Sequence, residues 1–569
     1  MNAAEAVIKC LEKHGVEYIF GYSGGAAIPF FDALVTTKTD IELILVRHEQ
    51  GATHMADGYA RATGKPGVVL VTSGPGATNT ITGLITAQMD SVPMIVITGQ
   101  TISPMLGKDA FQEADVFGIS LPVVKHSYLV RSHEDMTRIV NEAFYVATSG
   151  RPGPVIIDVP KDISSTEGVF DLDAAMDLPG YTVPGHGDVD RIKGIAKAFK
   201  KARKPVIMVG HGCILSDAEE ELKLLAEKLN VPVVSTLLGK GAISEKHDLA
   251  LGMLGMHGTA YANFAIKNCD LICSIGSRWD DRIVGKLDEF CADAVRIHID
   301  IDPSEYGKMI TPDHWCVGDA RLILEELLLH VEECDTKAWV KQVKEWRNDY
   351  PLKYDTIEGG LTMQEVLAEL DKQSDSEAII STDVGQHQMW AAQFCKSTKG
   401  KNWLSSGGAG TMGFGFPAAI GAQFGRPDDL VVSVSGDGGF QMTLFELSTA
   451  AIHKLPIKIL VLNNSYLGMV RQWQELFFDE RLSGVDMVGN PDFVKLAESY
   501  GVKAFRMSSS DDVAKVWEEA LAYNDGPCLI EAVCNKTDNV YPMIPAGANY
   551  DKMLLEAPET KLEKPTGST

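Results

Sequence analysis

The sequence has no apolar run that approaches the length of a membrane span. Its first residues, "MNAAEAVIKCLEKHG", predict an amphipathic helix that ends at Gly15. They have neither the apolar core of a signal peptide nor the Arg/Ser bias of a transit peptide. We therefore expect no membrane partner, and a soluble cytoplasmic protein or a mature form whose targeting segment is missing.

Cysteines with the spacing of a ligand pair are also missing. The ten cysteines are scattered and include no C-x-x-C, so neither a disulfide framework nor a zinc site is indicated, and a reducing compartment fits. Cys269 and Cys273 lie four residues apart on a predicted helix, where packing thiols are far commoner than metal ligands.

An excess of positive charge is absent. With 52 Lys and Arg against 77 Asp and Glu, the formal net charge is −25. Such a chain has no net positive field to drive counterion release, which argues against nucleic acid or an anionic membrane as partner. A local basic pocket for an anionic cofactor is not excluded.

Three blocks of the chain alternate helices with short apolar strands. This alternation is typical of parallel sheets with helices on both faces, and 569 residues are too many for one core. We expect an α/β fold of three doubly wound domains with mostly parallel sheets. The predicted parts are domains at 1–165, 189–335 and 361–535, a linker at 166–188, a charged connector helix at 336–360 and a tail at 536–569.

The stretch "IELILVRHEQGA" predicts a buried strand that runs directly into Arg47 and Glu49. A carboxylate at the end of a buried strand is costly unless it is paired or used. From these residues alone, Glu49 caps the helix that opens near Thr53, or it pairs with Arg47. A chemical role is the third interpretation.

The strongest chemical signal is "SGDGGF" followed by "LNNSYLGMV". Twenty-four residues separate Gly438 from Asn463, so the two loops follow consecutive parallel strands and emerge side by side. Glycines let the backbone approach an anion, and Asp437 and Asn464 supply the hard oxygens that Mg²⁺ prefers. Either piece alone is commonly a turn, whereas the paired spacing favours a phosphate and metal site.

This pair resembles the thiamin-diphosphate signature. The resemblance implies that Asp437, the side chain of Asn464 and the carbonyl of Tyr466 bind Mg²⁺ on the diphosphate, and that the first domain binds the pyrimidine. On its own, His387 would more often be structural. Further cofactor contacts implied by the resemblance are Pro75, Asn79, Val384, Gly385, Gln386, His387, Gly410, Met412, Gly436, Gly438, Gly439, Leu467, Gly468 and Met469.

With thiamin diphosphate, Glu49 acquires a task. The weakly acidic C2–H of the cofactor is deprotonated by its own 4′-amino group if a carboxylate in a dry site favours the imino tautomer. In this family the cofactor spans two subunits, so the resemblance implies a homodimer or homotetramer in which Glu49 of one chain faces Asp437 of the other. Met412 resembles the apolar residue that bends the cofactor, although core packing is the common role of Met.

Nearly the entire chain is similar to the acetohydroxyacid (acetolactate) synthase family, large catalytic subunit. The motifs that carry the similarity include "HEQGATHMADGYARATGKPGV", "TSGPGATNTITGL", "DAFQEAD", "RPGPVIIDVPKD", "SRWDDRIVGK" and "GMVRQWQELFF". Such enzymes decarboxylate pyruvate and join the two-carbon unit to pyruvate or 2-ketobutyrate in branched-chain amino-acid biosynthesis. A separate small regulatory subunit commonly accompanies them.

The same resemblance implies roles around the substrate. Gln112 and the neighbourhood of Gly25 would stabilise developing charge, Phe111 would line the pocket, and Lys161 would bring positive charge to its mouth.

Two further residues would act on the acceptor. Arg282 would hold its carboxylate with a bidentate fork. Trp473 would favour an ethyl over a methyl acceptor, a preference of about 1–3 kcal/mol.

The middle domain predicts a dinucleotide site only weakly. "MVGHGCILSD" has Gly210 and Gly212 but Leu215 in place of a third glycine. The resemblance suggests FAD, required without net redox, because "RWDDR" matches the flavin-dependent branch except for Trp279. Ser23 and Ala546 also depart from the family, each standing where a proline is usual. The implied flavin contacts are Gly210, Gly212, Thr236, Leu237, His257, Gly276, Arg278, Asp280, Arg282, Asp300 and Asp319.

Two alternatives stay open at this point. Another thiamin enzyme, of the pyruvate oxidase or sulfoacetaldehyde acetyltransferase type, shares Glu49 but not the combination of Gln112, Arg282 and Trp473. A non-catalytic cofactor-binding scaffold is the alternative from another class, and the intact Glu49 argues against it.

Overall fold

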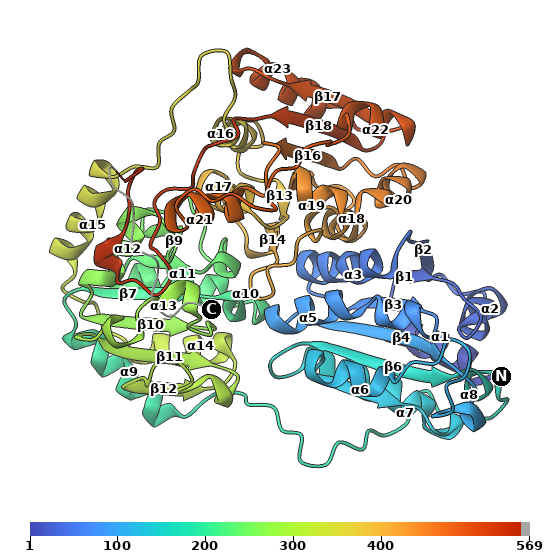
Figure 1. Ribbon diagram of the computed structural model, residues 1–569. Coiled ribbons are helices and arrows are strands. Elements are labelled where there is room, and N and C mark those ends of the chain that lie inside the picture. The colour runs from blue at the N-terminus through green and yellow to red at the C-terminus, as the bar shows by residue number, and fades with distance from the viewer. Residues whose placement is uncertain (559–569) are drawn as a thin grey trace.

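The computed structural model describes residues 1–558, so the polar end of the predicted tail lies outside the described residues. The described chain folds into three six-stranded sheets in which every strand pair is parallel. Helices cover both faces of each sheet (Figure 1). The predicted α/β class with three doubly wound domains is confirmed. No helix within residues 1–558 is long and apolar enough to cross a membrane.

The first sheet has the order β2-β1-β3-β4-β6-β5. Its strands are β1 (Tyr18–Tyr22), β2 (Glu42–Leu45), β3 (Gly67–Val71), β4 (Met94–Gln100), β5 (His126–Leu129) and β6 (Pro154–Pro160). One face is covered by α1 (Ala3–Lys13), α2 (Ile28–Thr36), α7 (Met136–Thr148) and α8 (Lys161–Ser165). The other face packs against α3 (Glu49–Thr63) and α5 (Ile81–Asp90). The short α4 (Pro75–Thr78) and α6 (Val116–Ser120) lie in connecting segments.

The third sheet repeats this topology with the order β14-β13-β15-β16-β18-β17. Its strands are β13 (Ile379–Thr382), β14 (Trp403–Ser405), β15 (Val431–Gly436), β16 (Lys458–Asn463), β17 (Lys503–Met507) and β18 (Cys528–Val533). Its helices are α16 (Met363–Gln373), α17 (Gln386–Phe394), α18 (Gly415–Gly425), α19 (Asp437–Gln441), α20 (Leu447–Ile452), α21 (Gly468–Phe477), α22 (Phe493–Ser499) and α23 (Ser510–Ala522). The structure thus contains an internal repeat that the sequence does not display.

The middle sheet has a different order, β12-β11-β10-β7-β8-β9. Its strands are β7 (Pro205–Val209), β8 (Val233–Ser235), β9 (Ala250–Met253), β10 (Leu271–Ile275), β11 (Val295–Asp300) and β12 (His314–Val317). Its helices are α9 (Val189–Lys201), α10 (His211–Leu215), α11 (Glu219–Leu229), α12 (Ala260–Asn268), α13 (Asp281–Val284), α14 (Ala320–His330) and α15 (Lys337–Asp349). Successive strands are added toward one edge of this sheet from β7 to β9 and toward the other edge from β10 to β12. The order therefore reverses between β7 and β10, where open α/β sheets form a ligand crevice.

The first and third domains share one apolar core, in which α3 packs directly against α18. A Cβ on Gly58 would lie 2.0 Å from the carbonyl oxygen of Ala418, and one on Gly421 would lie 1.8 Å from the carbonyl oxygen of Met55. Only glycine fits at such distances. The two glycines therefore set how closely the domains approach.

Two segments return to the middle domain after leaving it. Of the predicted connector helix at 336–360, only α15 (Lys337–Asp349) is helical, and it is anchored there because Nε1 of Trp339 donates to the carbonyl of Pro205 at 3.0 Å. The tail after β18 crosses the same domain (Figure 1), where the N–H of Ile544 donates to Met256 at 2.8 Å. The tail thereby covers α13. The hydroxyl of Tyr550 in the tail donates to the carbonyl of Ile283 in this helix.

Two predictions about local structure were wrong. The stretch before Glu49 is not a buried strand, because β2 is an edge strand that ends at Leu45, a side chain 47% exposed. Glu49 is instead the first residue of α3. Cys269 and Cys273 do not share a helix, since Cys269 follows α12 and Cys273 lies within β10.

Candidate functional site

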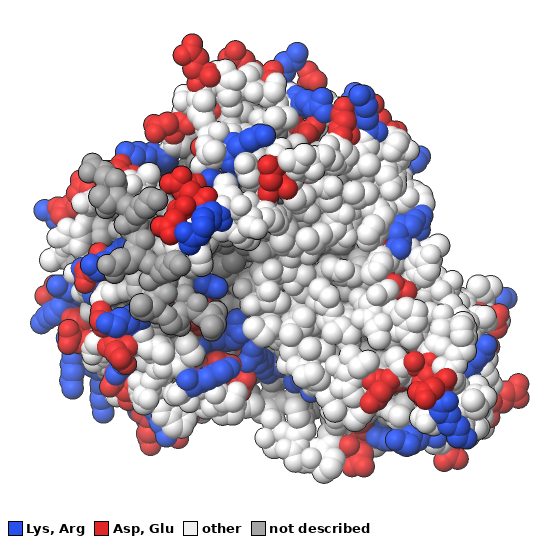
Figure 2. Space-filling model, in the orientation of Figure 1, with Lys and Arg blue, Asp and Glu red and all other residues white. Residues whose placement is uncertain are grey.

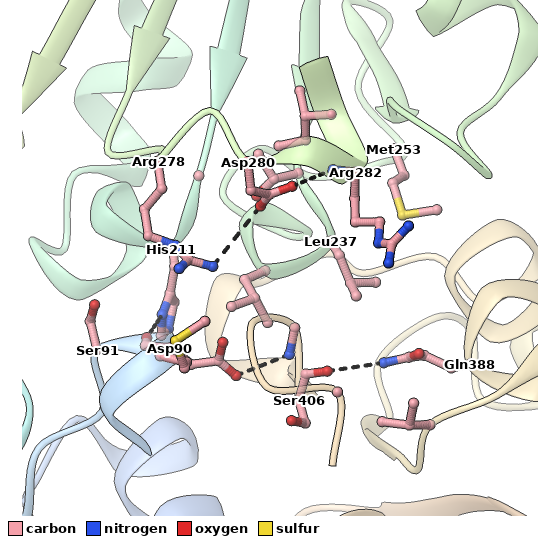
Figure 3. Close-up of a pocket in the computed structure, with 18 of the residues that line it drawn as sticks. Asp90, Ser91, His211, Leu237, Met253, Arg278, Asp280, Arg282, Gln388 and Ser406 are labelled. Carbon is pink, nitrogen blue, oxygen red and sulfur yellow. Dashed lines mark hydrogen bonds and ion pairs between the residues drawn. The ribbon is translucent and has the colours of Figure 1, made fainter. Parts of the chain in front are cut away.

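One cavity of about 800 Å³ lies between the three domains. Every predicted diphosphate, metal and flavin residue lines it except Pro75 and Asn79, and so does Trp473. In Figure 3, Arg278, Asp280 and Arg282 of the middle domain lie across the cavity from Asp90 of the first domain and from Gln388 and Ser406 of the third. The two predicted cofactor sites are therefore halves of one continuous space.

The third-domain half of the cavity is built on three neighbouring strands. The sheet places β13, β15 and β16 side by side, and from their carboxyl ends the chain enters α17, α19 and α21. None of these three helices has a side-chain cap. The first N–H groups of α17 and α21 are thus not taken up by a side-chain cap and can meet an anion, which the helix dipoles also favour. In the five-residue α19 the Asp437 carboxylate itself accepts from the N–H groups of Asp437 and Gly438.

The predicted metal ligands lie at this edge. Asp437 is 1% exposed, and burial raises its pKa to about 6. Asn464 lines the cavity, whereas Asn463 does not and donates to Glu531 at 2.9 Å. A divalent cation beside Asp437 would favour the charged carboxylate that burial disfavours. The donor set therefore fits Mg²⁺ with a phosphate.

Gln386 and His387 have neighbours that constrain their roles. Nε2 of Gln386 donates to Oε1 of Gln472 at 2.9 Å, and Oε1 of Gln386 is buried without a partner beside Gly468. This free acceptor suits a donor such as a metal-bound water better than a phosphate oxygen. Nε2 of His387 accepts from the N–H of Gly436 at 3.2 Å, and burial lowers the pKa of His387 to about 4. His387 is therefore neutral.

Two residues of this half were missed by the sequence analysis. Asn490 donates from Nδ2 to Oδ2 of Asp437 at 2.6 Å. Oδ1 of Asp383 accepts from the N–H groups of Val384 and Gly413, both at 2.8 Å, and thus joins the loop before α17 to the loop that carries Met412. Asn490 lies in a turn with no motif of its own, whereas Asp383 directly precedes the predicted "VGQH" contacts.

The middle-domain half is formed by two loops in close contact. A Cβ on Gly210 would lie 2.3 Å from the carbonyl of Gly276, and a Cβ on Gly212 would lie 2.7 Å from the Cα of Gly276. The predicted flavin glycines therefore serve loop packing as well as the cavity wall. Since Leu215 already belongs to α10, a third glycine is not needed for this contact.

The polar residues of this half have separable roles. Arg278 is only loosely paired with Asp280, at 4.0 Å, and Nε2 of His257 is buried without a partner. Both are free to bind a ligand. The Asp319 carboxylate is already engaged as the N-terminal cap of α14, where it accepts from the N–H of Leu322 at 3.1 Å. The departure Trp279 does not line the cavity, because it is buried in the core, stacked on His298.

The first domain also contributes to the cavity wall, which was not predicted. Residues 89–91 and 150–152 of this domain line it, as do residues 183–185 of the linker. The carboxylate of Asp90 accepts from the N–H of Gly408 at 2.7 Å and from Nη2 of Arg61 at 2.8 Å, and His211 contacts the carbonyl of Asp90 at 2.8 Å (Figure 3). Asp90 thus joins all three domains, a contact between distant segments that no local motif reveals.

Glu49 lies outside this cavity, at the carboxyl edge of the first sheet. Its side chain is 9% exposed, and Oε2 accepts from Nδ2 of Asn79 at 3.0 Å. The interpretation that Glu49 pairs with Arg47 was wrong, because Arg47 donates to the carbonyls of Leu45 and Val46. The cap of α3 is His48, whose Nδ1 accepts from Gln50 at 3.1 Å.

The remaining predicted residues are absent from the cavity wall as well. Gln112 lies against Gly74, next to Pro75, so this loop belongs to the Glu49 side. Phe111 is 89% exposed. Gly25, Ser23 and Lys161 are likewise on the first domain, at the ends of β1 and β6. A single chain therefore holds two separate half-sites.

Family models match the chain in three places. The thiamine pyrophosphate enzyme N-terminal TPP binding domain matches residues 1–119, the central domain matches 192–327, and the C-terminal TPP binding domain matches 383–532. The central match contains every strand of the middle sheet, whereas the N-terminal match ends before β5 and β6 and the C-terminal match begins just after β13.

Curated relatives align along nearly the whole chain. An acetolactate synthase large subunit of Cyanidium caldarium is 48% identical over 97% of this chain and 96% of its own length. One of Haemophilus influenzae is 44% identical over 98% and 99%. An acetolactate synthase of Mycobacterium leprae is 46% identical over 97% and 90%. This chain belongs to the acetolactate synthase large-subunit family of thiamine pyrophosphate enzymes.

Proposed function

We propose that this chain decarboxylates pyruvate and joins the two-carbon unit to a second 2-ketoacid, pyruvate or 2-ketobutyrate, in branched-chain amino-acid biosynthesis. The proposal rests on the single cavity in which Asp437 and Asn464 meet Arg282 and Trp473. The Arg282 side chain is 62% exposed and only loosely paired with Asp281, at 3.7 Å. The guanidinium of Arg282 is therefore available to bind the carboxylate of the second 2-ketoacid, and the indole of Trp473 is available to pack against the alkyl group of that 2-ketoacid.

Thiamin diphosphate and Mg²⁺ are the cofactors that we infer for the third-domain half. The uncapped starts of α17 and α21 would supply N–H donors for a diphosphate, and Asp437, Asn464 and the Tyr466 carbonyl would supply oxygens for the metal. Within residues 1–558, no group of three or more His, Cys, Asp or Glu side chains is placed so that it could hold a metal ion by itself. Mg²⁺ would therefore complete its shell with phosphate oxygens and water. When bound, thiamin diphosphate supplies the carbon nucleophile that attacks the 2-ketoacid.

Glu49 is the residue to which we assign the hydrogen bond with the aminopyrimidine. Its carboxylate is buried and receives an amide donor from Asn79, and among the described residues it has no ion-pair partner. A carboxylate in such a setting binds a ring nitrogen strongly. Gln112 and the Gly25 backbone, on the same side, would stabilise charge that develops on the substrate oxygen, and Lys161 would draw the anion in.

A second copy of the chain completes the proposed site. Glu49 and Asp437 belong to separate half-sites of one chain, and Phe111 is fully available to a neighbour. Figure 2 shows a broad face over α3, α5 and α18 with few charged side chains. Exposed apolar residues of the first domain, which include Ile85, Met105, Phe117 and Leu121, would be covered there. We propose a homodimer or homotetramer in which Glu49 of one chain faces Asp437 of another.

FAD is the ligand that we propose for the middle-domain half. Apolar residues such as Leu237, Met253 and Ile283 would pack on its rings, and Arg278 would meet its diphosphate. Asp300, at the end of β11, suits a ribose hydroxyl. Because the Trp279 side chain lies in the core, the larger residue of "RWDDR" does not reduce the space in this half of the cavity.

Two finer proposals concern the surroundings of the enzyme. All ten cysteines are free, which supports the cytoplasm as the compartment. We also propose a separate small regulatory subunit as partner, as the family resemblance implies.

The decisive test is product analysis with purified protein, pyruvate, thiamin diphosphate and Mg²⁺, with and without FAD. We expect acetolactate, formed only when both thiamin diphosphate and the metal are present. Hydrogen peroxide or acetyl phosphate without acetolactate would contradict the proposal, as would the absence of any pyruvate turnover with all cofactors supplied.

A further inference from the structure

A carboxylate of the third domain accepts hydrogen bonds from the backbone just before Glu49. Glu446, at the end of the turn Leu444–Glu446, is completely buried. Its Oε1 accepts from the N–H groups of Arg47 at 3.0 Å and His48 at 3.1 Å, and its Oε2 accepts from Oγ1 of Thr449 at 2.6 Å. Every partner is a donor, so the charged carboxylate satisfies the arrangement.

The sequence around Glu49 is adapted to this contact. A Cβ on Gly51 would lie 2.3 Å from Oε1 of Glu446, so only glycine leaves room for the carboxylate. The imidazole of His48 also lies beside the ring of Phe445, at 5.7 Å between centroids. The glycine of "HEQG" and the glutamate of "LFEL" are thus two sides of one interaction.

The segment is otherwise held by Val46, whose side chain is buried in the core and whose N–H donates to the carbonyl of Gly21 at 3.1 Å. It follows β2, which is an edge strand with Leu45 half exposed, and the Arg47 guanidinium donates only to nearby carbonyls. Without Glu446, the N–H groups of Arg47 and His48 would lose their acceptor. The first turn of α3, which begins with Glu49, would then be free to shift.

We propose that Glu446 is a positioning residue that holds Glu49 at the location required for thiamin diphosphate activation. The inference rests on the proposed function, in which Glu49 meets the aminopyrimidine. Because displacement by about 1 Å can cost about 100-fold in a catalytic rate, a fixed backbone at residues 47 and 48 has a direct chemical consequence. Glu446 itself touches neither cofactor nor substrate.

The test measures cofactor activation without turnover. The rate of deuterium exchange at C2–H of bound thiamin diphosphate is followed by quenched flow and NMR, with saturating Mg²⁺, alongside cofactor affinity. For Glu446→Ala we expect exchange about 10- to 100-fold slower, with the cofactor dissociation constant close to that of the wild type. Glu446→Gln, whose amide oxygen can still accept from both N–H groups, should recover most of the rate.

Gly51→Ala tests the same contact from the other side. Alanine raises the intrinsic helix propensity of α3 by about 1 kcal/mol, so the variant should fold, yet its methyl group would displace Glu446. We expect slow exchange here too. In the double variant Gly51→Ala/Glu446→Ala the clash is gone, so exchange should be no slower than in Glu446→Ala alone.

Glu142→Ala is the matched control, because Glu142 is equally buried and binds Arg138 in the first domain, on α7 rather than α3. It should lower the melting temperature without slowing exchange. Wild-type exchange in both Glu446→Ala and Gly51→Ala would overturn the inference, and so would a loss confined to cofactor affinity. Wild-type exchange in Glu49→Gln would instead contradict the proposed function.

Discussion

Asn490 donates a hydrogen bond of 2.6 Å to the carboxylate of Asp437, the buried acid at the start of α19. The bond fixes which oxygen of Asp437 remains for a metal. Residues that orient a ligand in this way commonly change metal affinity by about 10- to 100-fold when removed.

We therefore expect Asn490→Ala to raise the Mg²⁺ concentration needed for half-maximal thiamin diphosphate binding by about 10-fold or more. Quenching of protein fluorescence during a Mg²⁺ titration measures this. Asn268→Ala, at the exposed end of α12, is the control and should titrate like the wild type. An unchanged midpoint for Asn490→Ala would show that Asp437 needs no such support.

The glycine contact between α3 and α18 makes a stability prediction. Gly421→Ala would drive a methyl group into the carbonyl of Met55, and overpacking of this kind costs about 1–3 kcal/mol. Gly194→Ala is the matched control, since Gly194 lies within α9 and a Cβ there meets only His314 Nδ1 at 3.8 Å. Urea unfolding should show loss of stability for Gly421→Ala and a gain of up to about 1 kcal/mol for Gly194→Ala. Equal effects would contradict the tight packing.

Asp158 gives a prediction about pH. Burial raises its pKa to about 7, although Thr98 and Gln100 donate to it. Between the ordinary pKa near 4 and about 7, the folded chain keeps a proton that the unfolded chain loses, so this group's contribution to stability falls as pH rises. Asp158→Asn should remove that part of the slope, as read from melting temperatures between pH 4 and 8. A variant with the wild-type slope would contradict the assignment.

Trp473 should set a preference and not an absolute choice between acceptors. Trp473→Leu is expected to lower the ratio of acetohydroxybutyrate to acetolactate in a mixture of pyruvate and 2-ketobutyrate, by the equivalent of about 1–3 kcal/mol. Competition assays with product quantification measure the ratio. A variant that keeps the wild-type ratio would remove Trp473 from the acceptor pocket.

The sequence predicts the interior of each sheet far better than its edges. Interior strands such as β4 and β15 were predicted, because they are buried on both faces and appear as continuous apolar runs, although a helix was predicted across Cys273 in the interior strand β10. The strands β5, β9, β12, β14 and β17 were missed, and β2 was taken as buried. All six are edge strands, which are short and satisfied by one neighbour, so their composition carries little signal.

The same division holds for the site. Loops that follow interior strands, such as those at Gly436 and Asn464, were predicted because motif and strand coincide. Asp90, Asn490 and Glu446 were missed, since each acts on a segment distant in sequence and only the folded chain brings the partners together. The separation of Glu49 from Asp437 agrees with the two-chain site, which stays a prediction.

Substitution of one carboxylate tests the central claim most directly. Pyruvate conversion to acetolactate is measured for the wild type and for Glu49→Gln, with thiamin diphosphate, Mg²⁺ and FAD at saturation and with cofactor binding monitored in parallel. Glutamine keeps the size of the side chain and the contact with Asn79 but cannot share a proton with the aminopyrimidine. We predict nearly complete loss of activity with cofactor binding largely retained, whereas activity close to that of the wild type would contradict the account.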